Sequence, residues 1–282
     1  AVMFEEVRLE KEKGFRIERK RIAANYAMKE AHFHPYYELF YMVSGSCNSF
    51  IDNALHSIHG GDLLLIRCMD IHRATHYSQG INERIVVNFT EQFLESFYAE
   101  CGQEEVAALL QTSHVSVPEK RRPYLLQLFE EMKYEDSNHN SFSVFLKKKH
   151  LCEILINFFY DRENRNQKRP QNLFGDQAVM DAAEYISSHY MKELTLEEVA
   201  GIGHMSTTYF SRKFKQETGI GVKEYIIQIR VREASVLLLE TGKTIREIAS
   251  LCGFDDSNYF TEVFKRVKGV SPSQYRKNPE VV

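Results

Sequence analysis

The last third of the sequence contains one pattern of residues twice, and this duplication constrains the fold more than any other feature. Residues of the first copy recur 49 positions later before a central turn and 50 positions later after it. The matched residues are Thr195, Glu198, Ala200, Tyr209, Phe210, Phe214, Lys215, Gly219 and Tyr225, then Thr244, Glu247, Ala249, Tyr259, Phe260, Phe264, Lys265, Gly269 and Tyr275. The chain must therefore fold the same small unit twice.

Each copy is predicted to be a pair of helices joined by a tight turn. Thr195 and Thr244 each precede a glutamate by three residues, the spacing at which a hydroxyl and a carboxylate cap each other's free helix amides. Ser206 and Ser257 are favoured N-cap residues and open the second helix of each copy. Both second helices end at a glycine, which tolerates the left-handed backbone that terminates a helix. These signals predict two helix-turn-helix units.

The second helices have one apolar face and one polar face. Apolar residues at helical spacing predict the buried face, which comprises Tyr209, Phe210, Phe214, Tyr259, Phe260, Val263, Phe264 and Val267. The opposite faces carry hydroxyl, amide, arginine and glutamate groups that can bond base edges in a major groove, while Lys215 and Lys265 suit phosphates. A single polar helix face is more often only solvated. Its duplication favours DNA contact.

A long helix is predicted to join the two units. The segment from Val222 to Glu240 contains neither Gly nor Pro and has apolar residues at helical intervals. About twenty residues at 1.5 Å each make a rod of roughly 30 Å. Two recognition helices held at its ends would lie about one DNA turn, or ~34 Å, apart. One chain could then read two adjacent major grooves.

The segment from Ile245 to Arg276 resembles the signature of the AraC/XylS family of transcriptional regulators, and the preceding unit is similar to the first helix-turn-helix of that family. The resemblance implies an all-α DNA-binding domain over residues 176–282 and sequence-specific binding to double-stranded DNA. It also implies base contacts from Thr208, Ser211, Arg212, Ser257, Asn258, Thr261 and Glu262. The chain is accordingly expected to be a regulator and no enzyme.

The first part of the chain is predicted to be a β-sandwich or small barrel over residues 1–115. Short β runs alternate with turns from Phe15 to Phe89, a pattern typical of antiparallel sheets that enclose a pocket. The complete chain therefore belongs to the two-domain α+β class, with a jelly-roll-like N-terminal domain and a C-terminal all-α domain.

Four residues of the first domain could form a site. His32, His34 and Glu38 have the same parity along a strand, and His72 could meet them from a facing strand. Imidazoles and a carboxylate that converge in this way suit Zn, Ni, Fe or Mn. The stretch resembles the cupin signature, in which an HxH pair is followed by a glutamate, and a histidine comes from a second motif.

These four residues leave three functions open. In the leading hypothesis they bind a small polar effector, such as a sugar, and its binding changes how the chain holds DNA. If they hold a metal instead, the chain could be a metal sensor with metal-dependent DNA affinity. A metal-dependent cupin enzyme fused to a DNA-binding domain is the alternative from a different class.

Helices are expected between the two domains. Residues 116–162 contain helical patterns with a broad apolar band that includes Phe142, Phe145 and Phe158. We predict that this segment packs on the sheet and also forms a homodimer, as the family resemblance implies. The polar run that follows predicts a linker over residues 163–175.

Composition limits the class of protein. With 282 residues, 43% of them hydrophobic and 27% charged, the chain has the composition of a soluble protein with room for two domains. No apolar run approaches the ~20 residues that cross a bilayer, and the start lacks the order of a signal peptide. We therefore expect a cytoplasmic protein that does not bind membranes, with its five scattered cysteines reduced.

The net charge of −3 is unusual for a DNA-binding protein. Residues 194–277 contain 13 Lys and Arg against 10 Asp and Glu, so this segment is positive while the remainder of the chain is negative. Affinity for DNA should depend on where the basic side chains point more than on their excess.

Overall fold

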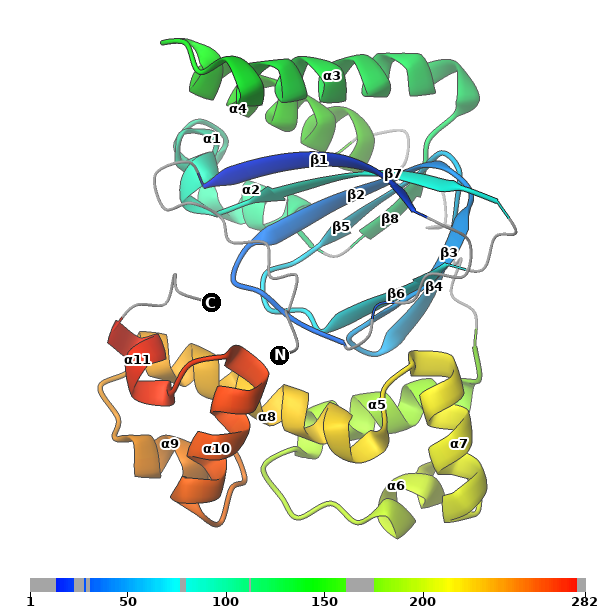
Figure 1. Cartoon of the computed structure of the whole chain (residues 1–282), viewed down its shortest axis with the longest axis vertical. Coiled ribbons are helices and arrows are strands. Elements are labelled where there is room, and N and C mark those ends of the chain that lie inside the picture. The colour runs from blue at the N-terminus through cyan, green and yellow to red at the C-terminus, as the bar shows by residue number, and fades with distance from the viewer. Residues whose placement is uncertain are drawn as a thin grey trace.

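The computed structural model describes residues 14–22, 28, 31–76, 80–111, 113–160 and 175–277. A β domain lies between a pair of helices on one side and a helical domain on the other (Figure 1). Apart from Gly175, the predicted linker over residues 163–175 lies outside the described residues. None of the described helices has the length and apolar content needed to cross a bilayer.

Two antiparallel sheets form the β domain, in agreement with the predicted sandwich or barrel. The larger sheet has the strand order β1-β7-β2-β5-β8, and the smaller has the order β4-β3-β6. The strands are β1 (Phe15–Ile22), β2 (Tyr37–Ser44), β3 (Ser46–Ile51), β4 (Ala54–His59), β5 (Asp62–Ile66), β6 (His72–His76), β7 (Asn82–Phe89) and β8 (Ser113–Ser116). The boundary predicted after residue 115 falls inside β8.

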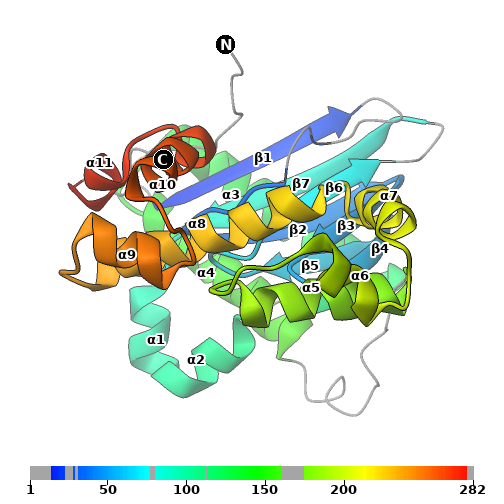
Figure 2. The same ribbon diagram turned by 90° about the horizontal axis from the view of Figure 1, so that it is seen from below.

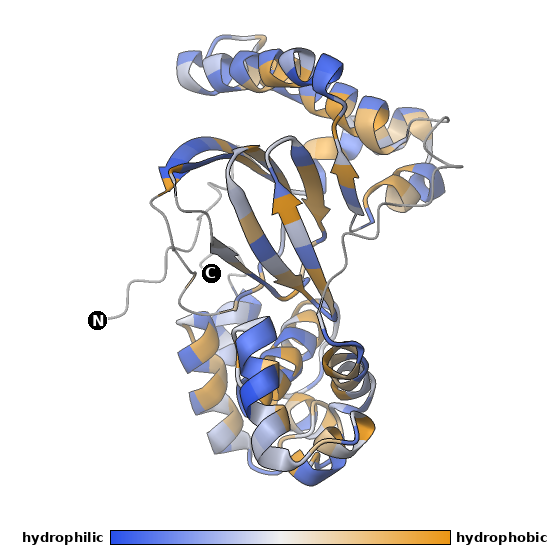
Figure 3. Ribbon diagram, turned by 90° about the vertical axis from the view of Figure 1, so that its right-hand side faces the viewer, coloured by the Kyte–Doolittle hydropathy of each residue, from blue (hydrophilic) through white to orange (hydrophobic). Residues whose placement is uncertain are grey.

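Both faces of the larger sheet are buried, and hydrophobic residues follow one another along its central strands β2 and β5, which lie among the strands seen in Figure 3. Phe40, Met42 and Leu64 face the space between the sheets. Leu39 and Tyr41 face the opposite way, into a core shared with four covering helices. These are α1 (Glu95–Cys101), α2 (Gln103–Leu109), α3 (Arg122–Asn138) and α4 (Ser143–Ile154), the last extended by a π turn over Leu155–Phe159. The helices of residues 116–162 thus form one packed unit with the sheet.

The helical domain contains the two predicted helix-turn-helix units. Its helices are α5 (Gln177–His189), α6 (Leu196–Ile202), α7 (Thr207–Thr218), α8 (Val222–Glu240), α9 (Ile245–Leu251), α10 (Ser257–Lys268) and α11 (Pro272–Lys277). Seen from below in Figure 2, α8 runs across the β domain with α5–α7 at one end and α9–α11 at the other. Its 19 residues correspond to about 28 Å, as the sequence predicted.

The helix caps explain where the recognition helices begin. Thr244 and Glu247 form the predicted capping box at α9, and Ser206 accepts a hydrogen bond from the Tyr209 amide at α7. The prediction that Ser257 caps α10 is wrong. Asp256 is the cap, because its Oδ1 atom accepts from the amides of both residue 258, at 2.7 Å, and Tyr259, at 2.8 Å. One carboxylate oxygen therefore satisfies two free amides there.

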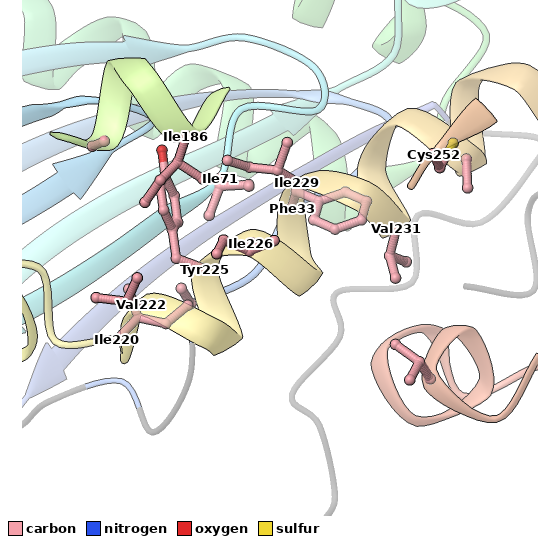
Figure 4. Close-up of a cluster of buried hydrophobic side chains, with 14 of the residues drawn as sticks. Phe33, Ile71, Ile186, Ile220, Val222, Tyr225, Ile226, Ile229, Val231 and Cys252 are labelled. Carbon is pink, nitrogen blue, oxygen red and sulfur yellow. The ribbon is translucent and has the colours of Figure 1, made fainter. Parts of the chain in front are cut away.

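The two domains share an apolar core. Five buried residues of the β domain belong to the same cluster as the interior of the helical domain, namely Ala31, Phe33, Phe50, Leu55 and Ile71. Figure 4 shows Phe33 and Ile71 with Ile226 and Ile229 of α8 in this cluster. Because apolar surface on both sides is buried, the domains are held in one arrangement.

Candidate functional site

The polar faces of α7 and α10 carry all the residues that the sequence assigned to DNA contact. Thr208, Arg212, Lys215, Asn258, Glu262 and Lys265 are exposed, and Ser211, Ser257 and Thr261 are half-buried. The opposite faces bury Phe210 and Phe214 in α7 and Phe260 and Phe264 in α10. The apolar stripes thus fix which way the polar faces point.

Two residues of these helices were assigned to the wrong face. Tyr209 and Tyr259 were predicted to be buried, but each residue is 51% exposed. Each precedes a buried phenylalanine by one residue, and one residue rotates a side chain by about 100° around a helix. The buried stripe is narrow, so the tyrosines join the polar face instead. Their hydroxyls are further donors for DNA. The one sequence feature that pointed to a shared role for the two tyrosines was their matched position in the repeat.

Lys213 has a structural role although it lies in the first recognition helix. Its Nζ atom is 2.7 Å from the carboxylate of Asp176 and 3.6 Å from that of Glu217. The hydrogen bond with Asp176 raises the pKa of Lys213. Because Asp176 also caps α5 through the amide of residue 178, this ion pair fixes α7 against α5.

The histidines that the sequence singled out lie together at the end of the β domain nearest the helical domain. His32 and His72 pair through two backbone hydrogen bonds of 3.1 and 2.9 Å, although His32 belongs to no named strand. The ring centroids of His34 and His72 are 4.9 Å apart, and those of His32 and His72 are 4.4 Å apart. One nitrogen from each of the three rings lies within 4.8 Å of the others. The three imidazoles therefore face a common space.

Backbone carbonyls fix the orientation of two of these rings. The Nδ1 atom of His34 lies 2.8 Å from the Tyr36 carbonyl oxygen, and the Nδ1 atom of His72 lies 2.9 Å from the Asp70 carbonyl oxygen. A carbonyl can only accept, so Nδ1 carries a proton, and in the neutral ring Nε2 then presents its lone pair. Both Nε2 atoms are buried without a hydrogen-bond partner within the described structure. Metal-bound histidines are oriented in this way.

Glu38 adds a carboxylate beside the three rings. One of its oxygens lies 3.5 Å from Nε2 of His34 and accepts a hydrogen bond of 3.2 Å from the side chain of Asn88. Burial alone would raise the pKa of Glu38, but the facing ring of His34 and the imidazoles of His72 and His32 outweigh it and hold the pKa well below its usual range. Burial and the neighbouring His34 lower the pKa of His72. The site thus combines an ionised carboxylate with a neutral imidazole.

This set of donors fits a transition-metal ion. Three imidazole nitrogens with an adjacent carboxylate are ligands that Zn, Ni, Fe and Mn accept, and the two unpartnered Nε2 atoms gain a partner when an ion binds. His32, His34 and His72 would hold the ion, with Glu38 beside them. Asn88, which orients Glu38, was missed from sequence because its role depends on the pairing of β2 with β7.

A shallow cavity of about 330 Å³ lies between the two domains, next to the histidines. Its lining comprises Tyr37, Asp52, Arg67, Cys68, Met69, Asp70 and Arg232. Asp70 connects it to the cluster, because its carbonyl oxygen is the partner of His72. The sequence did not predict this cavity, since Arg232 comes from α8 and the other residues come from the β domain.

Comparisons with known proteins agree with this architecture. A family model for an AraC-like ligand binding domain matches residues 19–155, and a model for a helix-turn-helix domain matches residues 199–278. The chain is 24% identical over 248 residues, 87% of each chain, to the transcriptional activator RhaS of an Enterobacter species.

Solved structures also resemble the chain. The C-terminal domain of AraT, a response regulator from Geobacillus stearothermophilus, is 42% identical, with a TM-score of 0.36 over 36% of this chain and 86% of that one. ToxT from Vibrio cholerae is 18% identical, with a TM-score of 0.41 over 94% of this chain and 98% of that one.

Proposed function

The chain belongs to the AraC/XylS family of DNA-binding transcriptional regulators, and from this premise we propose that a transition-metal ion held by His32, His34 and His72 is its effector. The observation that carries the proposal is the pair of buried Nε2 atoms, on His34 and His72, that face the same space without a hydrogen-bond partner among the described residues. Leaving such atoms unpaired costs about 1–3 kcal/mol each. A bound ligand would remove that cost.

DNA is proposed to be read by both units at once. The exposed side chains of Thr208, Arg212, Asn258 and Glu262 would reach base edges, while Lys215 and Lys265 would bind phosphates. Support comes from the placement of all six on polar faces that the apolar stripes turn away from the core. Because such a regulator must reach the chromosome, we propose that it works in the cytoplasm.

The test of the metal effector begins with untagged protein purified without chelators. We expect close to one equivalent of a transition metal per chain by elemental mass spectrometry, and its loss in His72→Ala. His59→Ala is the control, because His59 is an exposed imidazole of the same domain and should not affect the metal content. Wild-type protein that stays metal-free after incubation with Zn, Ni, Fe and Mn would contradict the proposal.

DNA binding provides the second half of that test. The ion should change the affinity of the wild-type protein for a duplex selected from a random library, and His72→Ala should not respond. A protein that binds no duplex more tightly than random DNA at physiological salt, with or without the ion, would contradict the proposed function as a regulator of specific promoters.

A small organic effector is the second candidate, and the cavity between the domains favours it. Arg67 and Arg232 with Asp52 and Asp70 line this cavity and would suit a small polar ligand such as a sugar. Saturable binding of such a ligand to protein without metal would support this alternative. A metal-dependent enzyme is not retained, because the relatives over most of the chain are transcriptional regulators.

We also propose that the chain is a homodimer through α3 and α4. Phe142 and Phe145 at the start of α4 are 71% and 68% exposed, and Tyr134 of α3 is exposed as well. Exposed aromatic side chains on two neighbouring outer helices are typical of an interface. A second copy of the chain would cover them and would place two DNA-binding domains in one particle.

A further inference from the structure

Lys268, the last residue of the second recognition helix, is buried against the β domain. Only 3% of this residue is exposed, and its ammonium lies 4.1 Å from the centre of the Phe33 ring and 5.7 Å from that of Tyr275. The same ammonium donates a 3.4 Å hydrogen bond to the carbonyl oxygen of Phe33. A buried lysine is costly unless it is held in this way. The end of α10 is therefore attached to residue 33 at two points.

The internal repeat shows that this contact is specific to the second unit. The residue of the first unit that matches Lys268 is Thr218, fifty positions earlier. Thr218 is also buried, but its hydroxyl donates to the carbonyl oxygens of Phe214 and Ile220 within its own unit. At this position the side chain of the first unit bonds within its own unit, whereas that of the second unit contacts the β domain. Lys268 therefore links the second recognition helix to the β domain, whereas Thr218 stabilises the end of the first one.

Phe33 connects this contact to the histidine site. It lies between His32 and His34 in the chain, so a backbone shift at either histidine also displaces Phe33. Its ring lies in the apolar cluster beside α8, as Figure 4 shows. The third histidine has a similar neighbour, because Ile71 precedes His72 and lies in the same cluster. The backbone segments 32–34 and 71–72 therefore contribute to both the histidine site and the domain interface.

The first unit is docked on the β domain independently of residue 33, through α7, which contacts β3, and through Tyr225 at the start of α8. Phe50 of β3 packs edge-on against Tyr225, with ring centroids 5.5 Å apart, and the Tyr225 hydroxyl donates to the carbonyl oxygen of Asp52. The β domain therefore holds the two units through separate contacts. Reading two adjacent grooves requires that the units keep one relative position.

We propose that Phe33 and Lys268 couple the histidine site to the second recognition helix. When a bound ion holds His32 and His34 in place, Phe33 stays packed against Lys268. The orientation of α10 relative to α7 is then fixed. When these histidines are not held, α10 is free to shift while α7 stays docked. This coupling rests on the proposed function of the site and explains how its occupancy reaches the DNA.

The experiment compares wild type with Lys268→Thr, which installs the residue that the first unit has at this position, and with Lys268→Met, which keeps the volume of the side chain without its charge. Lys223→Met is the matched control, because it removes a lysine charge from an exposed position of α8. For each protein, zinc affinity is measured by calorimetry. The dissociation constant for a selected duplex is then measured with and without Zn²⁺.

In the wild type and in Lys223→Met, Zn²⁺ should change the DNA dissociation constant by about 5- to 150-fold, the usual range for coupled sites. In Lys268→Thr and Lys268→Met the change should fall below about 2-fold, while each chain still binds one zinc. Zinc bound at one per chain with an unchanged response in both variants overturns the coupling alone. Zinc bound by the wild type without any change in DNA affinity overturns both the coupling and the role of zinc as effector. A wild type that binds no zinc overturns the zinc site and the coupling with it.

Discussion

The carboxylate of Asp52 lies 2.8 Å from the guanidinium of Arg232, and this ion pair joins the turn between β3 and β4 to the long helix α8. The two partners respond differently to the pairing. Burial opposes the charge on Arg232, but Asp52 and Glu233 outweigh it and raise the pKa of Arg232. For Asp52 burial prevails over Arg232, and Asp70 adds to it, so the Asp52 pKa rises to about 6. Keeping Asp52 ionised in the folded chain therefore costs free energy.

This cost predicts the pH dependence of the variant Asp52→Asn. The folded chain favours protonated Asp52, so the wild type gains stability as the pH falls through about 6 towards the ordinary carboxyl value. An asparagine does not titrate there. Between pH 7.5 and pH 5, the unfolding free energy of the wild type should rise by about 1 kcal/mol relative to the variant. Urea denaturation of both proteins at three pH values measures the difference, and a change of opposite sign would contradict the prediction.

Much of the helical domain could be predicted because its signals are local. The pair Thr244 and Glu247 marks a helix start within four residues, and the bounds of α8 agree with the segment expected from its lack of Gly and Pro. Tyr259 was misplaced because spacing alone does not give the width of a buried stripe, which depends on how the neighbouring helices pack. Asp256 was overlooked as a cap because Ser257, beside it, is also a favoured cap residue.

Arg212 should contribute base discrimination in the first unit. The side chain is exposed on the polar face of α7, and a bidentate arginine contact is worth about 1–3 kcal/mol against the wrong base. We expect Arg212→Ala to weaken binding by that amount and to relax the preference at one base pair. Titration against duplexes with single substitutions measures both effects. A uniform loss over all duplexes would instead indicate a phosphate contact.

Lys215 and Lys265 occupy matched positions of the two units and should act through phosphates. Both are exposed on the recognition helices. Each alanine variant should weaken binding about equally for all sequences and reduce the slope of log affinity against log salt by about 1. Lys223→Ala, which removes an exposed lysine from α8, should leave the slope unchanged. A slope equal to that of the wild type in both Lys215→Ala and Lys265→Ala would contradict this role.

The functional sites were harder to predict than the fold because they depend on contacts between distant segments. The spacing along the chain was enough to group His32 with His34, although neither lies in a named strand as the parity argument had assumed, and a second motif supplied His72. The contact between Phe33 and Lys268 joins residues 235 positions apart and depends on how two domains dock. No periodicity in either segment records that docking. The repeat contains one relevant difference, because Lys268 stands where the first unit has Thr218. Only the structure shows that this difference corresponds to a contact with the β domain.

The exposed aromatic residues of α3 and α4 predict the last outcome, which concerns the oligomeric state. At micromolar concentration, light scattering of the wild type should give twice the mass of one chain. Phe145→Glu should give a monomer, because a charge at this exposed position would be buried without a partner in the dimer. Ile81→Glu is the control, since Ile81 is exposed to a similar extent, 67%, in the β domain. Because Phe145 is exposed in the single chain, its replacement should leave the fold of each chain intact. A monomeric wild type would contradict the proposed dimer, and a dimeric Phe145→Glu would place its interface elsewhere.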